Sequence, residues 1–141
     1  MNTTLYYSYY LDTNIWISFT IGKRLQHLSR LLSNPNLQIF ICNEIINEYK
    51  DVVSRPKIKK YISNQRIKET IEIIKLSTIN EKQLTKVKLS RDENDDFLLA
   101  FSVDVNANYI ITGDKDLLIL KNFKNTNIVT FDDFLQILNN I

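Results

Sequence analysis

The sequence predicts an α/β protein with a central parallel β-sheet that helices cover on both faces. Two observations lead to this prediction. Short apolar runs typical of strands alternate with longer segments of helical periodicity along most of the chain. The chain also contains only two glycines and two prolines, so little interrupts its helices. A length of 141 residues and a hydrophobic content of 44% suit a single domain over residues 1–141.

Five segments have the composition of β-strands. The first, YYSYYL, is dominated by tyrosine, and the segment YIIT has the strongest strand composition in the chain. The run LQIFIC is short and apolar, whereas QLTKVKL alternates between polar and apolar residues. The expected strands cover residues 6–11, 37–42, 83–89, 109–112 and 127–130.

Seven segments have helical patterns. A buried helix is expected to start at Ile15, after the polar residues that follow the first strand. Asn43 is expected to cap the helix that follows the second expected strand and reaches Val53. Pro56 is expected either to end that helix or to start the next one. The expected helical segments are residues 15–19, 24–32, 43–53, 57–62, 65–77, 95–105 and 132–138.

Residue usage excludes several classes of protein. The chain has one cysteine, Cys42, which lies in an apolar run and is expected to be buried and unreactive. One histidine and one cysteine cannot form a zinc cage within one chain. No run approaches the ~18 apolar residues of a membrane span, and the N-terminus lacks the pattern of a secretion signal. We therefore expect a cytoplasmic protein with no membrane partner.

The charges are unevenly distributed although the net charge is only +2. Residues 55–91 contain eleven Lys or Arg and three Glu, a balance of +8, and the remainder has a balance of −6. One interpretation is that amphipathic helices are solvated by lysine. The other is that a basic flank binds a polyanion beside an acidic site that acts on it. The charges alone do not choose between these interpretations.

Four acidic residues occupy comparable positions relative to the expected strands. Asp12 and Asp114 directly follow strands, Glu48 lies in the helix after the second strand, and Asp95 opens a helix. Because the carboxyl ends of parallel strands share one edge of a sheet, these four acids are expected to converge. Converging carboxylates repel one another, and a hard cation such as Mg²⁺ or Mn²⁺ would offset that repulsion with the oxygen ligands it prefers.

Each acid also has a structural explanation. Asp12 suits a helix N-cap, with Thr13 behind it, and Glu48 suits an exposed helix surface. Asp114 in TGDKD suits a turn. Asp95 suits the N-terminus of a helix, where a negative charge interacts favourably with the helix dipole. Several neighbouring acids are alternative candidates for the position of the third acid. Asp116 is either a fifth oxygen ligand or a cap of the LLIL segment. The competing acids are Asp92, Glu93 and Asp96.

With these residues identified, the sequence resembles PIN-domain ribonucleases, in particular the branch that contains toxin components of toxin–antitoxin systems. The resemblance rests on LDTNIWIS, CNEIINEYKDVVSRPKIKKY, SRDENDDFLLAFSVDVNANYIITGDKDLLIL and FDDFLQIL, which together cover nearly the whole chain. It implies a three-layer PIN-like α/β fold and metal-dependent hydrolysis of RNA. It also implies a cognate antitoxin protein as partner and a possible homodimer.

The resemblance implies a role for individual residues. Asp12, Glu48, Asp95 and Asp114 match the acids that bind Mg²⁺ or Mn²⁺. Two polar residues match those that orient the carboxylates, namely Asn14 and Thr112. The sequence departs from the family pattern at Glu93 and Asp96, so the choice of Asp95 over Asp96 depends on its spacing to TGD.

A basic segment is expected to bind RNA phosphates, and other functions compete with RNA cleavage. The segment comprises Arg55, Lys57, Lys59 and Lys60, with Tyr61 or Trp16 as candidates for base stacking. Core packing is the favoured role of Trp16. An aspartate-nucleophile phosphatase is disfavoured because Asn14 stands where that chemistry requires an acid. A non-catalytic PIN-like module that binds RNA or protein is the main alternative.

Overall fold

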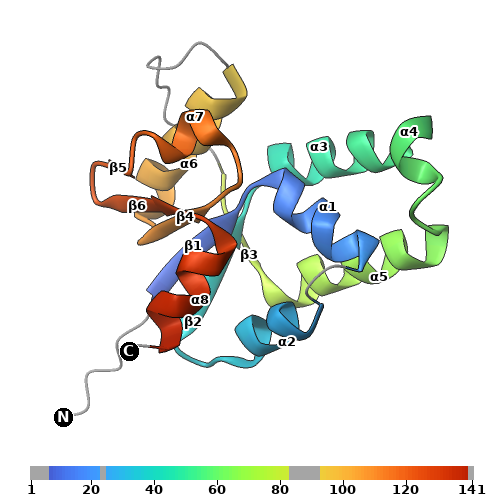
Figure 1. Ribbon diagram of the computed structural model, residues 1–141, viewed down its shortest axis with the longest axis horizontal. Coiled ribbons are helices and arrows are strands. Elements are labelled where there is room, and N and C mark those ends of the chain that lie inside the picture. Colours follow the sequence, from blue (N-terminus) through green and yellow to red (C-terminus); the bar gives the residue numbers. More distant parts are fainter. Residues whose placement is uncertain (1–6, 23–24, 83–92, 140–141) are drawn as a thin grey trace.

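The computed structural model describes residues 7–22, 25–82 and 93–139, and for residues 25, 26 and 93–95 it describes the backbone alone. These residues form an α/β fold around one six-stranded sheet (Figure 1). The strands are β1 (Tyr7–Leu11), β2 (Leu37–Ile41), β3 (Ile79–Asn80), β4 (Tyr109–Ile111), β5 (Asn122–Phe123) and β6 (Thr126–Val129). The helices are α1 (Thr13–Ile21), α2 (Leu25–Ser33), α3 (Asn43–Ser54), α4 (Pro56–Lys59), α5 (Asn64–Ser77), α6 (Glu93–Val105), α7 (Lys115–Leu118) and α8 (Phe131–Asn139).

The strand order is β3-β2-β1-β4-β6-β5, and it places β1 near the centre of the sheet. All neighbouring strands are parallel except β5, which pairs with β6 in the antiparallel direction. The chain builds β2 and β3 on one side of β1 and then returns to build β4 and β6 on the other. The order therefore reverses between β1 and β4, where Leu11 pairs with Ile111. In open α/β sheets, ligands bind at such a reversal, beyond the carboxyl ends of the strands.

Helices cover both faces of the sheet. Successive side chains of β1 point to opposite faces, so neighbouring residues of this strand contact different helices. Tyr10 donates a hydrogen bond to the Leu98 carbonyl of α6, and its ring packs edge-on against Phe101 at 5.1 Å. The ring of Tyr9 instead packs against Phe134 of α8 at 4.9 Å. Figure 1 shows α1, α3 and α5 on one side of the strands and α6 on the other. The predicted fold class is thus confirmed.

A buried cluster of hydroxyl groups joins three of these helices. Thr20 Oγ1 of α1 lies 2.7 Å from the hydroxyl oxygen of Tyr49 in α3 and 3.0 Å from Thr70 Oγ1 in α5. Each of these three residues is buried. Arg66 of α5 also donates to the Thr20 carbonyl at 3.3 Å, next to Gly22, which ends α1 with a left-handed φ of 104°. These contacts fix α1, and with it the residues at its start, against α3 and α5.

Several element boundaries differ from the predictions. The predicted cap at Asn43 is wrong by one residue, because α3 begins at Asn43 and Cys42 holds the N-cap position. The Asn43 side chain instead accepts a hydrogen bond from Asn80 Nδ2 at 3.1 Å. The helix predicted over 57–62 is limited to Pro56–Lys59, with Pro56 starting it. The strand predicted over 83–89 lies outside the described residues, and β3, β5 and α7 were not predicted.

Two predictions about single residues are confirmed. Trp16 is fully buried, in edge-on contact with Phe19. Cys42 is also fully buried, and its burial raises the pKa of the thiol to about 12, which keeps it protonated and unreactive at neutral pH. In the part of the chain that the structure describes, no helix has the length and apolar character needed to cross a membrane.

The hydroxyl cluster can be tested by removing one oxygen atom. Tyr49→Phe eliminates the hydrogen bond to Thr20, and we expect it to lower the free energy of unfolding by about 1 kcal/mol. Tyr61→Phe is the control, because the Tyr61 side chain is 67% exposed and its loss of a hydroxyl is expected to change nothing measurable. Urea unfolding of both variants provides the measurement. Equal stability of the two variants would contradict a structural role for the cluster.

Candidate active site

Asp12 lies directly beyond β1, at the central reversal of the strand order. Its backbone amide donates to the Ile111 carbonyl at 2.9 Å and thereby extends the pairing of β1 with β4. Asp12 holds the N-cap position at the start of α1. The residue is buried, with 8% of its surface exposed.

Thr112 connects the end of β4 to two of the predicted acids. Its hydroxyl donates to Asp12 Oδ2 at 2.8 Å and accepts a hydrogen bond from the Asp114 amide at 3.0 Å. Thr112 itself is fully buried. Asp114 Oδ1 in turn accepts from the Asp116 amide at 2.9 Å and caps α7, so Asp114 is half-buried while the Asp116 side chain is exposed. One hydroxyl thus fixes the Asp12 carboxylate and the backbone that carries Asp114.

Glu48 reaches the same region from α3, which follows β2. Its Oε2 accepts a hydrogen bond from Thr13 Oγ1 at 3.1 Å, and Thr13 is buried at the first position of α1. The sequence analysis did not single out Thr13 as a residue that orients an acid. Its buried position directly after Asp12 was the available signal. The side chain of Asn14, which was predicted to orient a carboxylate, is exposed, and no described hydrogen bond joins that side chain to an acid. The backbone amide of Asn14 does interact with the Asp12 carboxylate and lowers its pKa.

The third predicted acid lies in the first turn of α6. The backbone of α6 begins at Glu93, so Asp95 occupies its third position, but the Asp95 side chain lies outside the described residues. Asp96 is half-buried and takes part in an interaction of its own. The hydrogen bond from Tyr10 to the Leu98 carbonyl holds this turn of α6 against β1. The preference for Asp95 over Asp96 therefore remains a prediction.

The electrostatics of Asp12 suit a cation ligand. Burial raises the pKa of Asp12 above its ordinary value, and the negative charge of Asp114 adds to the rise. The hydroxyl of Thr112 and the backbone amides of Asn14 and Thr13 lower the pKa in part. Among the described residues, no lysine or arginine forms an ion pair with Asp12. A buried carboxylate without a basic partner is costly, and a divalent cation would offset that cost.

Carboxylate oxygens are also the ligands that Mg²⁺ and Mn²⁺ prefer, so the chemistry of the donor set fits such an ion. Within the described ranges, however, no three acidic, histidine or cysteine side chains form a group that could hold a metal. A complete ligand set would thus need a further acid, as predicted for Asp95.

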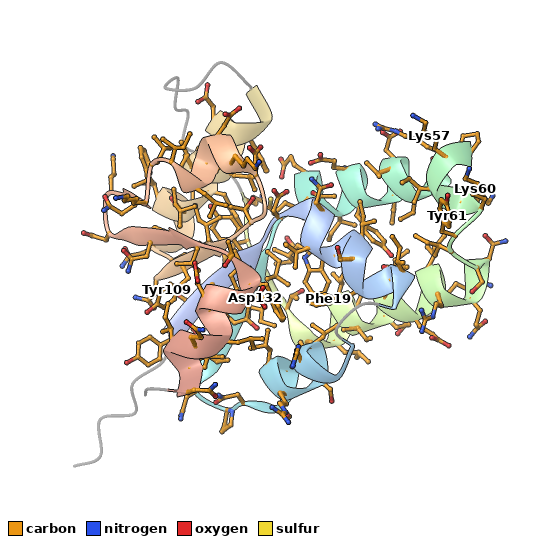
Figure 2. All side chains as sticks on the ribbon, viewed as in Figure 1. Phe19, Lys57, Lys60, Tyr61, Tyr109 and Asp132 are labelled. Atoms are coloured by element: carbon orange, nitrogen blue, oxygen red, sulfur yellow. The ribbon has the colours of Figure 1, made fainter. Side chains whose placement is uncertain are left out.

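The predicted RNA-binding residues lie at the other end of α3 from the strand edge (Figure 2). Lys57, Lys59 and Lys60 are exposed on and beside α4, and the ammonium of Lys60 lies 5.2 Å from the ring centre of Tyr61. Arg55 is exposed as well, but it forms an ion pair of 2.8 Å with Asp51 of α3. This pairing neutralises part of the positive charge, so the three lysines are the freer cations of the segment.

Comparisons with known proteins agree with this architecture. A family model described as PIN domain matches residues 8–116. A chain of VapBC2 from Rickettsia felis, solved bound to a DNA fragment from their promoter, has a similar structure, with a TM-score of 0.58 and 17% identity over 89% of this chain and 99% of that chain. A domain of a functionally unknown protein from Methanocaldococcus jannaschii has a TM-score of 0.57 and 16% identity over 89% and 91% of the two chains. None of the curated proteins is significantly similar in sequence.

The burial of Asp12 predicts a pH-dependent stability. Its folded-state pKa is raised above 3.8, so ionisation destabilises the fold once the pH exceeds that value. In EDTA, we expect Asp12→Asn to raise the free energy of unfolding at pH 7 relative to the natural chain. This gain should shrink as the pH falls through the raised pKa and vanish below the ordinary value, where both states bind the proton.

The exposed Asp133 provides the control for this measurement. Asp133→Asn removes one carboxylate without relieving any burial, so no gain in stability is expected at neutral pH. Urea unfolding of the natural chain and both variants between about pH 3 and pH 7 would give the comparison. A destabilised Asp12→Asn protein at pH 7 in EDTA would contradict the proposed electrostatics.

Proposed function

Because the chain belongs to the PIN-domain family, whose members are generally nucleases, we propose that it is a metal-dependent endoribonuclease. It hydrolyses phosphodiester bonds of RNA and acts as the toxin component of a type II toxin–antitoxin system. The observation that carries the proposal is the buried Asp12 carboxylate, held by Thr112 at the reversal of the strand order. No other described position combines a buried acid with the sheet edge where α/β folds bind ligands.

Four acids would hold the Mg²⁺ or Mn²⁺ ion in this proposal: Asp12, Glu48, Asp95 and Asp114. When bound, such an ion supplies a Lewis acid that stabilises phosphate charge and lowers the pKa of its water. The protein contributes the geometry. Thr112 restrains Asp12, and Thr13 restrains Glu48, so two carboxylates from different elements need little reorganisation to bind a ligand.

The lysines near α4 support RNA as the substrate. Lys57, Lys59 and Lys60 are exposed on the strongly basic part of the chain and lie at the end of α3, which also carries Glu48. Phosphate groups of a strand that extends from the acidic site along α3 would reach these cations. Tyr61 beside Lys60 is exposed and able to stack on a base, whereas the fully buried Trp16 is not.

We propose an antitoxin as the protein partner, because the structurally similar chain belongs to a VapBC2 complex. A homodimer and a cytoplasmic location are part of the same proposal. One observation favours a second function, an RNA- or protein-binding module without cleavage activity. Within the described residues the acids do not form a three-ligand group, and such a module would not need one.

Cleavage of RNA tests the main proposal. In Mg²⁺ or Mn²⁺ we expect cutting of a labelled RNA pool, and EDTA should abolish it. Asp12→Asn and Glu48→Gln should each reduce the rate by more than about a hundredfold, since the loss of residues that merely orient metal ligands already costs ~10–100-fold. Glu44→Gln is the control, because Glu44 is exposed one turn earlier on α3.

The outcomes separate the two functions. Metal-dependent cutting that the two site variants lose and Glu44→Gln retains would support the nuclease. Absence of cutting by the natural chain, across several RNAs and both metals, would overturn it and favour the binding module. Equal activity in all variants would place the reaction elsewhere or in a contaminant.

The basic segment makes a separate prediction about RNA affinity. A Lys59→Ala/Lys60→Ala variant should bind single-stranded RNA more weakly and lower the slope of log K against log salt by about 1.4, or ~0.7 for each phosphate contact. Lys121→Ala/Lys124→Ala removes the same charge from exposed positions around β5 and should leave the slope unchanged. Both double variants also carry Asp12→Asn, which prevents cleavage during the titration. The affinity is measured by fluorescence anisotropy. Identical slopes for the two double variants would contradict the assignment.

A further inference from the structure

A small cavity lies beside the candidate site and shares one residue with it, Thr112. It has a volume of about 210 Å³, which is below the ~300–1,000 Å³ of sites for drug-sized ligands but well above the ~30 Å³ of one water molecule. Its size therefore suits one or two fused rings. Figure 2 shows two of its lining residues, Phe19 of α1 and Asp132 of α8, facing the space between these helices.

The cavity is continuous with the candidate site through Thr112. Thr112 lines the cavity, and its hydroxyl also donates to Asp12 Oδ2 at 2.8 Å. Gly113, the next residue, lines the cavity as well and directly precedes Asp114. A Cβ atom at Gly113 would meet no other atom within 4 Å, so the backbone borders open space here. A group bound in the cavity would thus lie next to the acids.

The walls of the cavity are apolar and partly aromatic. Ile15 and Phe19 contribute from α1, and Phe131 contributes from the start of α8. The rings of Phe19 and Phe131 pack edge-on at 5.4 Å, which fixes their positions before any ligand arrives. An apolar and partly aromatic lining of this kind favours an aromatic ring over a hydrated ion.

The polar lining of the cavity disfavours phosphate as the occupant. Its polar side chains include Ser18, Thr130 and Asp132, and among the described residues no lysine or arginine lines it. Thr130 is partly engaged, because its hydroxyl accepts from the Asp133 amide at 3.1 Å. The carboxylate of Asp132 would repel a phosphate, but its four lone-pair positions can accept N–H groups from a base in addition to its existing interaction.

We infer that this cavity binds the nucleobase of a nucleotide adjacent to the cleaved phosphate, with a preference for bases that carry an amino group. The inference rests on the proposed function, since it names a recognition site for the same substrate. The base packs against Phe19 and Phe131, and its amino group donates to Asp132. Uracil offers a single ring N–H donor and no amino group, so it is the disfavoured base.

Nucleoside binding tests the cavity independently of cleavage. Adenosine, guanosine, cytidine and uridine are titrated into isotope-labelled protein in EDTA, with ribose 5-phosphate as the base-free control. We expect the nucleosides to shift the NMR signals of Ile15, Phe19 and Gly113, and ribose 5-phosphate to leave them unchanged. Ser18→Leu should fill the cavity and abolish these shifts, whereas the same change at Ser29, an exposed residue of α2, should not.

Two neighbouring acids of α8 test the base preference. Asp132→Asn should reduce the preference for amino-bearing bases over uridine by about tenfold. Asp133→Asn, in the same helical turn but outside the cavity, should leave it unchanged. Both substitutions lie at exposed positions in the first turn of α8, so they still test the base preference if Ser18→Leu does not fold.

The outcomes distinguish a failure of this inference from a failure of the proposed nuclease function. Binding of nucleosides at the cavity in a protein that cleaves no RNA would retain the inference and reject the nuclease. Cleavage of RNA without nucleoside shifts, or shifts caused equally by ribose 5-phosphate, would overturn the inference and retain the nuclease. An unchanged preference in Asp132→Asn would overturn the role of that carboxylate.

Discussion

The hydrogen bond from Thr112 to Asp12 is the interaction on which the arrangement of the site depends. It joins the first residues beyond β1 and β4, whose last residues pair at Leu11 and Ile111. Sheet pairing brings the two residues together, and the hydroxyl then fixes which way the carboxylate faces. Because Asp12 is buried with a raised pKa and no basic partner among the described residues, the fold carries an electrostatic cost at this point. Such local costs are expected where function requires them, and a bound cation would relieve this one.

The central part of the fold was readable from the sequence because its strands are mostly apolar or aromatic runs bounded by polar residues. The positions of Asp12 and Asp114 followed from the same boundaries. Three features were not readable for physical reasons. The strands β3 and β5 contain two residues each, too few to produce a periodic pattern. The hydrogen-bond partner of Thr13 is Glu48, 35 residues away, and this contact exists only once α1 and α3 are packed together. The prediction of a cap at Asn43 failed because Cys42 ends the strand run in an extended conformation and α3 starts directly after it.

Helix α3 relates the acidic and basic parts of the molecule. Glu48 lies in its middle, and α4 with its lysines follows its end. At a rise of 1.5 Å per residue, the six residues from Glu48 to Ser54 span about 9 Å. The buried contact of Tyr49 with Thr20 holds α3 against α1, which begins beside Asp12. The separation between the acids and the lysines is therefore set by packed helices and not by a loop. A strand of RNA bound to both would be positioned by the core of the protein.

The same helix α1 also borders the cavity on its other side, so its packing bears on recognition as well as on the acids. Its first residue restrains Glu48, while Ile15 and Phe19 line the cavity. Thr112 completes this coupling, because it contacts Asp12 and forms part of the cavity wall. A group bound in the cavity would lie beside the residue that orients the buried carboxylate. If the cavity binds a nucleobase as proposed, substrate recognition and the geometry of the acids are linked through the side chain of Thr112.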